Sequence, residues 1–176
     1  MFLQKTNFPI EFIIANDNSP DNTDSIIKQI IKNTPDNVQV RYTKHEVNKG
    51  MNPNFTWALK QAKGKYIAVC DGDDYWIDEN KLQKQTDFLE QNHDYGLVFT
   101  NSKRINNNDI YENVINIHPD DSKYKYLLPE NIIPTLTTLF RNDQQVIEEY
   151  FHLLNTKNWT IADYPLWFLK IGRAHV

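Results

Sequence analysis

Cysteine, basic charge and long apolar runs are scarce in this chain, and each scarcity excludes a class of protein. A single cysteine, Cys70, permits neither an intrachain disulfide nor a thiolate cluster for zinc, and its apolar neighbours predict a buried, unreactive thiol. The net charge of −4 lacks the basic excess of a nucleic-acid-binding protein, so we expect no nucleic-acid partner. No apolar run reaches the roughly 18 residues of a membrane span, so we expect no transmembrane segment.

The residues that are present favour one folded domain. Apolar residues make up 40% of the 176 residues and aromatic residues 12%, which excludes a disordered chain. This length allows one domain with its own core but is short for two. We therefore expect a single domain over residues 1–170. Residues 171–176, IGRAHV, read as a non-native tail because they match the translation of a sequencing adapter.

Strand-like and helix-like patterns alternate through the first hundred residues. This order predicts an α/β fold with a mainly parallel sheet and helices on both faces. Apolar residues at 26, 27, 30 and 31 predict a helix with one buried stripe. Asn52-Pro53 predicts the N-cap and first residue of a second helix, and Asp78 predicts the N-cap of a third. The predicted strands are 10–16, 38–43, 65–70 and 95–100, and the predicted helices are 24–32, 52–62 and 78–91.

The pattern is looser after residue 101. Residues 103–117 predict a polar hairpin with an exposed turn at 106–108. The β-branched run 135–140 predicts another strand, and 142–154 predicts a helix.

Acidic residues follow two of the predicted strands. Asp17 follows the strand that ends at residue 16, and three carboxylates in Asp71-Gly72-Asp73-Asp74 follow the strand that ends at Cys70. Ligands bind outside the carboxyl ends of parallel strands, and clustered carboxylates raise one another's pKa unless a cation joins them. Hard oxygen donors suit Mg²⁺ or Mn²⁺. A solvated turn explains the same four residues, whereas a calcium loop does not, because a strand and not a helix precedes them.

These motifs resemble those of the family 2 glycosyltransferases of the GT-A fold. The resemblance rests on IIANDNSPDNT followed by NKGMNPNFTWALKQAKGKYIAVCDGDDYW, and it covers roughly residues 11–91. In that family one strand ends in a D-D/N-x-S-x-D-x-T loop, and a later strand ends in D-x-D-D-x-W. The order and spacing of the whole set make the resemblance specific, since a lone D-x-D pair is weak evidence.

The resemblance assigns roles to four aspartates. Asp17 matches the carboxylate that bonds the nucleotide base, although an Asx-turn or a helix cap is an alternative role for it. Asp71 and Asp73 match the D-x-D pair, with Asp71 toward the ribose and Asp73 toward a Mn²⁺ or Mg²⁺ cofactor. Asp74 is expected to orient a water on that metal. Asn16 stands where a second acid is frequent in the family.

A second segment, Ile161 to Trp167, resembles the family's E-D-x-x-L-W sequence. Asp163 takes the position of the aspartate that acts as general base in inverting members, while Ala162 replaces the usual acid. An N-cap of the last helix is an alternative role for Asp163, and the two roles are compatible.

The resemblance implies a metal-dependent, inverting transfer of a sugar from a nucleotide-diphosphate donor to a hydroxyl of a glycan or lipid-linked acceptor. It implies a cytoplasmic enzyme, peripheral to the membrane in its full-length form. A non-catalytic nucleotide-sugar-binding module or an inactive fragment remains an alternative. A nucleotidyltransferase is less favoured, because the chain has no glycine- and arginine-rich phosphate loop with an activating lysine.

The resemblance also predicts that this chain is a fragment. In the family a first strand and helix precede the segment that matches here, and the first strand lies centrally in the sheet. We therefore expect the chain to lack that strand, that helix and a C-terminal part. The strands at 10–16 and 65–70 would then either lose the neighbour that both pair with or close up and pair directly.

Overall fold

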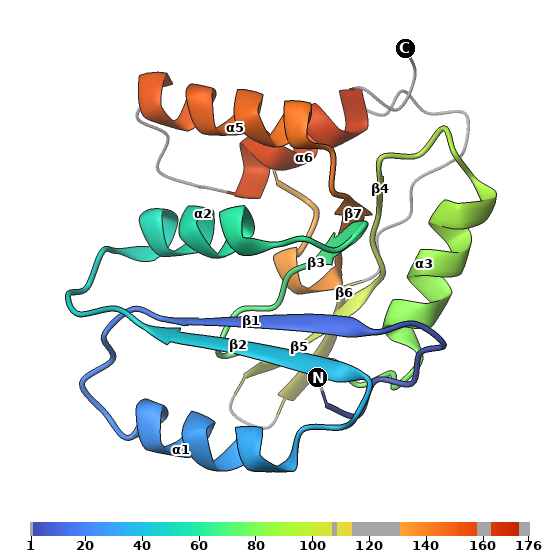
Figure 1. Cartoon of the computed structure of the whole chain (residues 1–176). Helices are drawn as coiled ribbons and strands as arrows, with labels where there is room; N and C mark the ends of the chain where they lie inside the picture. Colours follow the sequence, from blue (N-terminus) through green and yellow to red (C-terminus); the bar gives the residue numbers. More distant parts are fainter. Residues whose placement is uncertain (1, 107–108, 114–130, 158–162, 173–176) are drawn as a thin grey trace.

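The computed structural model describes residues 2–106, 109–113, 131–157 and 163–172. Strands and helices alternate through the first hundred residues, as the sequence predicts (Figure 1). The strands are β1 (Ile10–Asn16), β2 (Val38–Lys44), β3 (Tyr66–Ala68), β4 (Leu97–Val98), β5 (Ser102–Asn106), β6 (Asp109–Asn113) and β7 (Leu139–Arg141). The helices are α1 (Thr23–Ile30), α2 (Met51–Gln61), α3 (Lys81–Gln91), α5 (Gln144–Lys157) and α6 (Asp163–Gly172), with short 3₁₀-helices η1 (Ile31–Asn33) and η2 (Thr135–Thr137).

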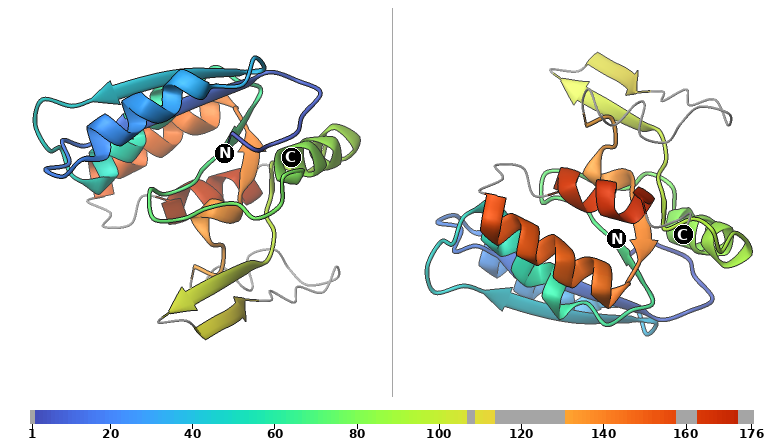
Figure 2. Two further views of the ribbon diagram at one scale, coloured as in Figure 1. Left: turned by 90° about the horizontal axis from the view of Figure 1, so that it is seen from below. Right: turned by 90° about the horizontal axis from the view of Figure 1, so that it is seen from above.

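The described strands form three small sheets rather than one mainly parallel sheet. β1 and β2 pair in parallel along their whole length, as predicted. β7 lies between β3 and β4 and runs antiparallel to both. In the described residues neither β3 nor β4 pairs with β1. β5 and β6 form the expected polar hairpin, which projects from the rest of the molecule (Figure 2). The α/β class is thus confirmed, and the expected dominance of parallel pairing is not found.

Helices lie on both sides of the β1–β2 pair, as expected, with α1 on one side and α2 on the other (Figures 1 and 2). The predicted buried stripe of α1 is wrong, because Ile26 and Ile30 are 44% and 48% exposed and the helix has no buried residue. Only two strands lie beneath α1, and they do not cover its apolar face. In the described residues no helix has the length and apolar character of a membrane span.

The main core lies away from α1, among α2, β3, β4, β7, α5 and α6. Phe140 of β7 and Trp167 of α6 are fully buried at its centre, with ring centroids 5.6 Å apart. Burial of large side chains of this kind contributes about 1.5–3 kcal/mol each. The remaining buried members of this cluster are Leu59, Ile67, Leu97, Ile133, Ile147, Tyr150 and Leu166.

The prediction of a strand over 135–140 is wrong for its first half, which forms the 3₁₀-helix η2. The hydroxyls of Thr137 and Thr138 donate to the carbonyl oxygens of Pro134 and Thr135, at 2.7 and 2.8 Å. Such local bonds compete with strand pairing. β7 therefore begins only at Leu139.

Two helix starts also differ from the prediction. The N-cap of α2 is Gly50, which has a φ of 88°, and not the predicted Asn52. α3 begins at Lys81 instead of just after Asp78, because Asp78 accepts hydrogen bonds from the backbone N–H groups of Asn80 and Lys81 and so forms a turn there. The expected turn at 107–108, the end of the hairpin beyond 113 and the tail beyond 172 lie outside the described residues.

Candidate active site

The acidic turn Asp71–Asp74 follows β3, and one hydrogen bond within it and one just after it hold its backbone. The N–H of Asp74 donates to the carbonyl oxygen of Asp71 at 3.1 Å, which closes the turn. The indole Nε1 of Trp76 donates to the carbonyl oxygen of Leu136 in η2 at 2.8 Å. The three carboxylates of the turn are exposed to solvent, while Trp76 is half-buried. The turn therefore leaves its carboxylates accessible to solvent, with Asp71 at the wall of the cavity described below.

A buried lysine supports this turn from α3. Lys81 is only 6% exposed, and its Nζ lies 4.5 Å from the ring centroid of Trp76. Nζ donates to Oε1 of Gln85 at 2.6 Å, and Nε2 of Gln85 donates to the carbonyl oxygen of Thr137 at 2.8 Å. Burial lowers the pKa of Lys81 to about 8. Sequence reasoning missed this group, although Lys81 and Gln85 share the helical face of the buried residues Leu82 and Leu89.

Asp163 is the first residue of α6, and its side chain is held in place by two donors. Its Oδ2 accepts hydrogen bonds from Oγ1 of Thr135 at 2.7 Å and from Nδ2 of Asn131 at 3.3 Å. Nothing in the sequence pattern pointed to Thr135 or Asn131, because their partner is remote in the chain. Asp163 therefore has a fixed orientation before any substrate binds.

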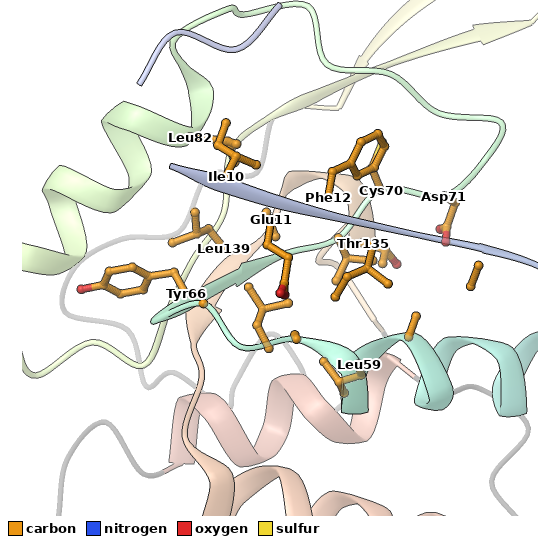
Figure 3. Close-up of a pocket in the computed structure, with 18 of the residues that line it drawn as sticks. Ile10, Glu11, Phe12, Leu59, Tyr66, Cys70, Asp71, Leu82, Thr135 and Leu139 are labelled. Carbon is orange, nitrogen blue, oxygen red and sulfur yellow. The ribbon is translucent and has the colours of Figure 1, made fainter. Parts of the chain in front are cut away.

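Asp71 and Asp163 both line a cavity of about 740 Å³, and Figure 3 shows Asp71 and Thr135, the partner of Asp163, on its wall. Desolvation by the surrounding protein raises the pKa of Asp71, and the charges of Asp74, Asp73 and Asp163 raise it further. Desolvation and the charge of Asp73 also raise the pKa of Asp74. The fold thus places the two acidic segments that the sequence singled out on one cavity, and among the described residues none of their carboxylates forms an ion pair.

The donor set fits a divalent cation that is shared with a ligand. Among the described residues no three acidic, histidine or cysteine side chains converge on one metal position. Mg²⁺ and Mn²⁺ sites commonly take only one or two carboxylates and complete their coordination with waters and phosphate oxygens. Asp73 and Asp74 fit that pattern, whereas a structural metal held by protein ligands alone does not fit.

Asp17 is not among the residues that line the cavity. Its two carboxylate oxygens accept the backbone N–H groups of Lys49 and Gly50, at 2.7 and 2.8 Å. Asp17 therefore fixes the loop that leads into α2, and its neighbour Asn16 is buried and bonds the Tyr42 hydroxyl at 3.0 Å. Contact of Asp17 with a nucleotide base remains a prediction.

We expect Asp71→Asn to stabilise the metal-free protein at pH 7. The folded state raises the pKa of Asp71 above that of the unfolded chain, so ionising this carboxyl costs stability as the pH rises through the folded pKa. Removing the charge should raise the melting temperature by about 2 °C at pH 7 and leave it unchanged near pH 3. Thermal denaturation at both pH values measures this, with exposed Asp36→Asn as control. A lower melting temperature at pH 7 would show that the Asp71 charge is compensated.

Comparison with known proteins places most of the chain, although not Asp163, within one family model. The family model described as "Glycosyl transferase family 2" matches residues 2–156. The glucosyltransferase WfgD of Escherichia coli is 28% identical over 165 residues, which cover 94% of this chain and 59% of WfgD. The glucosyltransferase WfaP of E. coli is 39% identical over 88 residues, or 50% of this chain and 33% of WfaP. An uncharacterised protein of Mycobacterium tuberculosis is 40% identical over 96 residues, 54% of this chain and 27% of that protein.

The chain therefore spans between about a quarter and three fifths of the length of these relatives. The match with the family model extends over most of the chain and includes β1 to β7, with the acidic turn among them. Membership of this family implies the GT-A fold, with which the α/β arrangement agrees. The chain therefore belongs to the glycosyltransferase family 2.

Proposed function

We propose that this chain holds the donor-binding and catalytic carboxylates of a metal-dependent, inverting enzyme that transfers a sugar from a nucleoside diphosphate to an acceptor hydroxyl. The observation that supports this most is that Asp71 and Asp163 line the same cavity and are close enough for the charge of Asp163 to raise the pKa of Asp71. The two residues come from distant segments of the chain, one at the end of β3 and one at the start of α6.

Each carboxylate has a separate role in this proposal. Asp71 accepts a hydrogen bond from the ribose, and Asp73 and Asp74 would hold Mn²⁺ or Mg²⁺, which would supply positive charge beside the diphosphate leaving group. Asp163 takes the proton of the acceptor hydroxyl while the oxygen attacks the anomeric carbon. The bond from that carbon to the diphosphate breaks, the diphosphate departs, and the configuration at the anomeric carbon inverts.

The names of two relatives suggest which substrates to test first. WfaP and WfgD are described as UDP-Glc:alpha-D-GlcNAc-diphosphoundecaprenol beta-1,3-glucosyltransferases. We propose UDP-glucose as donor and a lipid-linked N-acetylglucosamine diphosphate as acceptor. Incubation of the protein with radiolabelled UDP-glucose, Mn²⁺ and that lipid should give a labelled lipid product. Mn²⁺-dependent UDP-glucose binding without any transfer would favour a binding module instead.

Thr135→Val should slow catalysis without weakening donor binding. The change removes the 2.7 Å hydrogen bond that orients the Asp163 carboxylate, and it keeps the size of the side chain. We expect kcat to fall about tenfold while KM for the donor stays within about twofold, because misplacing a base affects only the chemical step. Steady-state kinetics measure both constants, and Thr135→Ser should restore kcat. An unchanged kcat, or an equal change in KM, would contradict the positioning role.

A further inference from the structure

The 3₁₀-helix η2 is hydrogen-bonded to both segments that carry the proposed chemistry. Oγ1 of Thr135, its first residue, donates to Oδ2 of Asp163 at 2.7 Å. Just after the acidic turn, Nε1 of Trp76 donates to the carbonyl oxygen of Leu136 in η2 at 2.8 Å. The hydrogen bonds of a 3₁₀-helix have poorer geometry than those of an α-helix, so a single short turn needs contacts from outside to hold it. The orientation of Asp163 therefore depends on what fixes η2.

Gln85 of α3 is a second side chain that holds η2 from outside. Its Nε2 donates to the carbonyl oxygen of Thr137 at 2.8 Å, and its Oε1 accepts from Nζ of Lys81 at 2.6 Å. Gln85 is 3% exposed and Thr137 2%, so water does not replace these bonds. The carbonyl oxygen can only accept and the ammonium can only donate, so position 85 requires a side chain that does both. The glutamine amide meets this requirement, whereas a carboxylate or a thioether of similar length does not.

Lys81 contacts both of the side chains that hold η2. Its Nζ lies 4.5 Å from the ring centroid of Trp76 and donates to Gln85. Because an ammonium cannot accept, it turns the amide so that Oε1 faces Lys81 and Nε2 faces η2. Burial lowers the pKa of Lys81 to about 8, so at pH 7 the lysine is charged and its burial costs stability. Residues that are unfavourable for stability in this way are expected where function requires them.

We propose that Lys81 and Gln85 are positioning residues for the proposed general base, and that they act through η2 and Thr135 on the carboxylate of Asp163. Neither Lys81 nor Gln85 lines the cavity, so their effect on the reaction is indirect. This inference rests on the proposed function, because the orientation of Asp163 matters for catalysis only if Asp163 takes the proton. Loss of either residue should then slow the chemical step and leave donor binding unchanged.

Steady-state kinetics of Gln85→Met test the effect on catalysis. The change keeps the length of the side chain and removes both polar atoms that link Lys81 to η2. We expect kcat to fall about tenfold while KM for the donor stays within about twofold. Gln91→Met makes the same substitution at the exposed end of α3 and should leave kcat unchanged. An unchanged kcat in Gln85→Met, or an equal change in KM, would overturn the positioning role.

A double variant tests whether the effect passes through Thr135. Gln85→Met and Thr135→Val break the same route to Asp163, so kcat of the double variant should be within about twofold of the slower single variant. Independent effects would instead multiply to a loss of about 100-fold, and that result would overturn the shared route.

Amide hydrogen exchange reports on η2 without any reaction, so it separates failure of this inference from failure of the proposed function. The amides of Thr137 and Thr138 form the local hydrogen bonds of η2. Gln85→Met should speed their exchange about tenfold and leave the amide of Ile147 in α5 unchanged. Unchanged exchange at both threonines would overturn the inference, whatever reaction the protein catalyses.

Lys81→Met is a second variant that removes the cost of burying a charge and keeps an unbranched side chain beside Trp76. It should speed exchange at the same two amides of η2 and lower kcat without raising KM for the donor. Effects of Gln85→Met that are absent from Lys81→Met would overturn the role of the lysine.

Discussion

Replacing Asp163 by asparagine should reduce sugar transfer about 1,000-fold and leave donor binding nearly unchanged. The amide keeps the shape of the side chain and can still accept the hydrogen bond from Thr135, but it cannot take a proton from the acceptor hydroxyl. General-base catalysis typically contributes 10²- to 10⁴-fold to a rate. A loss confined to the chemical step lowers kcat and does not change the dissociation constant of the donor.

The measurement is the single-turnover rate of transfer, together with the donor dissociation constant from calorimetry. Asp36→Asn is the matched control, because Asp36 is exposed, lies between η1 and β2 and does not line the cavity. Near-normal transfer by Asp163→Asn would mean that Asp163 serves only to start α6. A parallel loss of donor binding would place Asp163 in contact with the donor and not with the acceptor.

Replacing Asp73 by alanine should abolish the metal dependence of donor binding. Asp73 lies in the acidic turn, where its charge raises the pKa of both Asp71 and Asp74, so a cation bound there relieves the repulsion. A metal contact to a diphosphate contributes several kcal/mol, so affinity in the presence of Mn²⁺ should fall on the order of 100-fold. Binding without metal should change little or improve, because one negative charge is gone.

Mn²⁺ electron paramagnetic resonance in the presence of a nucleoside diphosphate measures metal occupancy directly. The free Mn²⁺ signal should persist with Asp73→Ala and disappear with wild-type protein and with Asp36→Ala. Undiminished Mn²⁺ uptake by Asp73→Ala would exclude Asp73 as a ligand. Loss of Mn²⁺ uptake in Asp74→Ala would then identify Asp74 as the metal ligand.

The sequence was informative wherever the signal is local. The acidic turn follows a strand, and the residues from β1 to α3 keep the order and spacing that the resemblance requires. The parallel pairing of β1 with β2 also follows from the helix between them. Asp163 was found because a short segment around it carries its own pattern. These features need no knowledge of which distant elements meet.

Features that depend on distant contacts were missed. The position of β7 between β3 and β4 depends on pairings between residues far apart in the chain, such as Tyr66 with Arg141, and local patterns do not encode it. The hydrogen bond from Thr135 to Asp163 is equally remote. The burial of Lys81 was also not predicted, because a buried lysine is rare. Its ammonium lies over the ring of Trp76 and donates to the side-chain oxygen of Gln85, and both contacts offset the cost of burial.

The sequence left open whether β1 and β3 close up and pair directly. They do not pair in the described structure, and residues of both strands line the cavity. α1 and β1 contribute no residue to the main buried cluster. The stability of this half of the molecule therefore depends on contacts that the core around Phe140 and Trp167 does not provide.

Calorimetric titration of UDP into residues 1–176, with and without Mn²⁺, tests the central claim most directly. The claim is that the acidic turn at the end of β3 binds a nucleoside diphosphate together with a divalent cation. We predict saturable binding that requires Mn²⁺ and is lost in Asp73→Ala. Binding of equal affinity in EDTA, or Mn²⁺-dependent binding that survives in Asp73→Ala, would contradict the account.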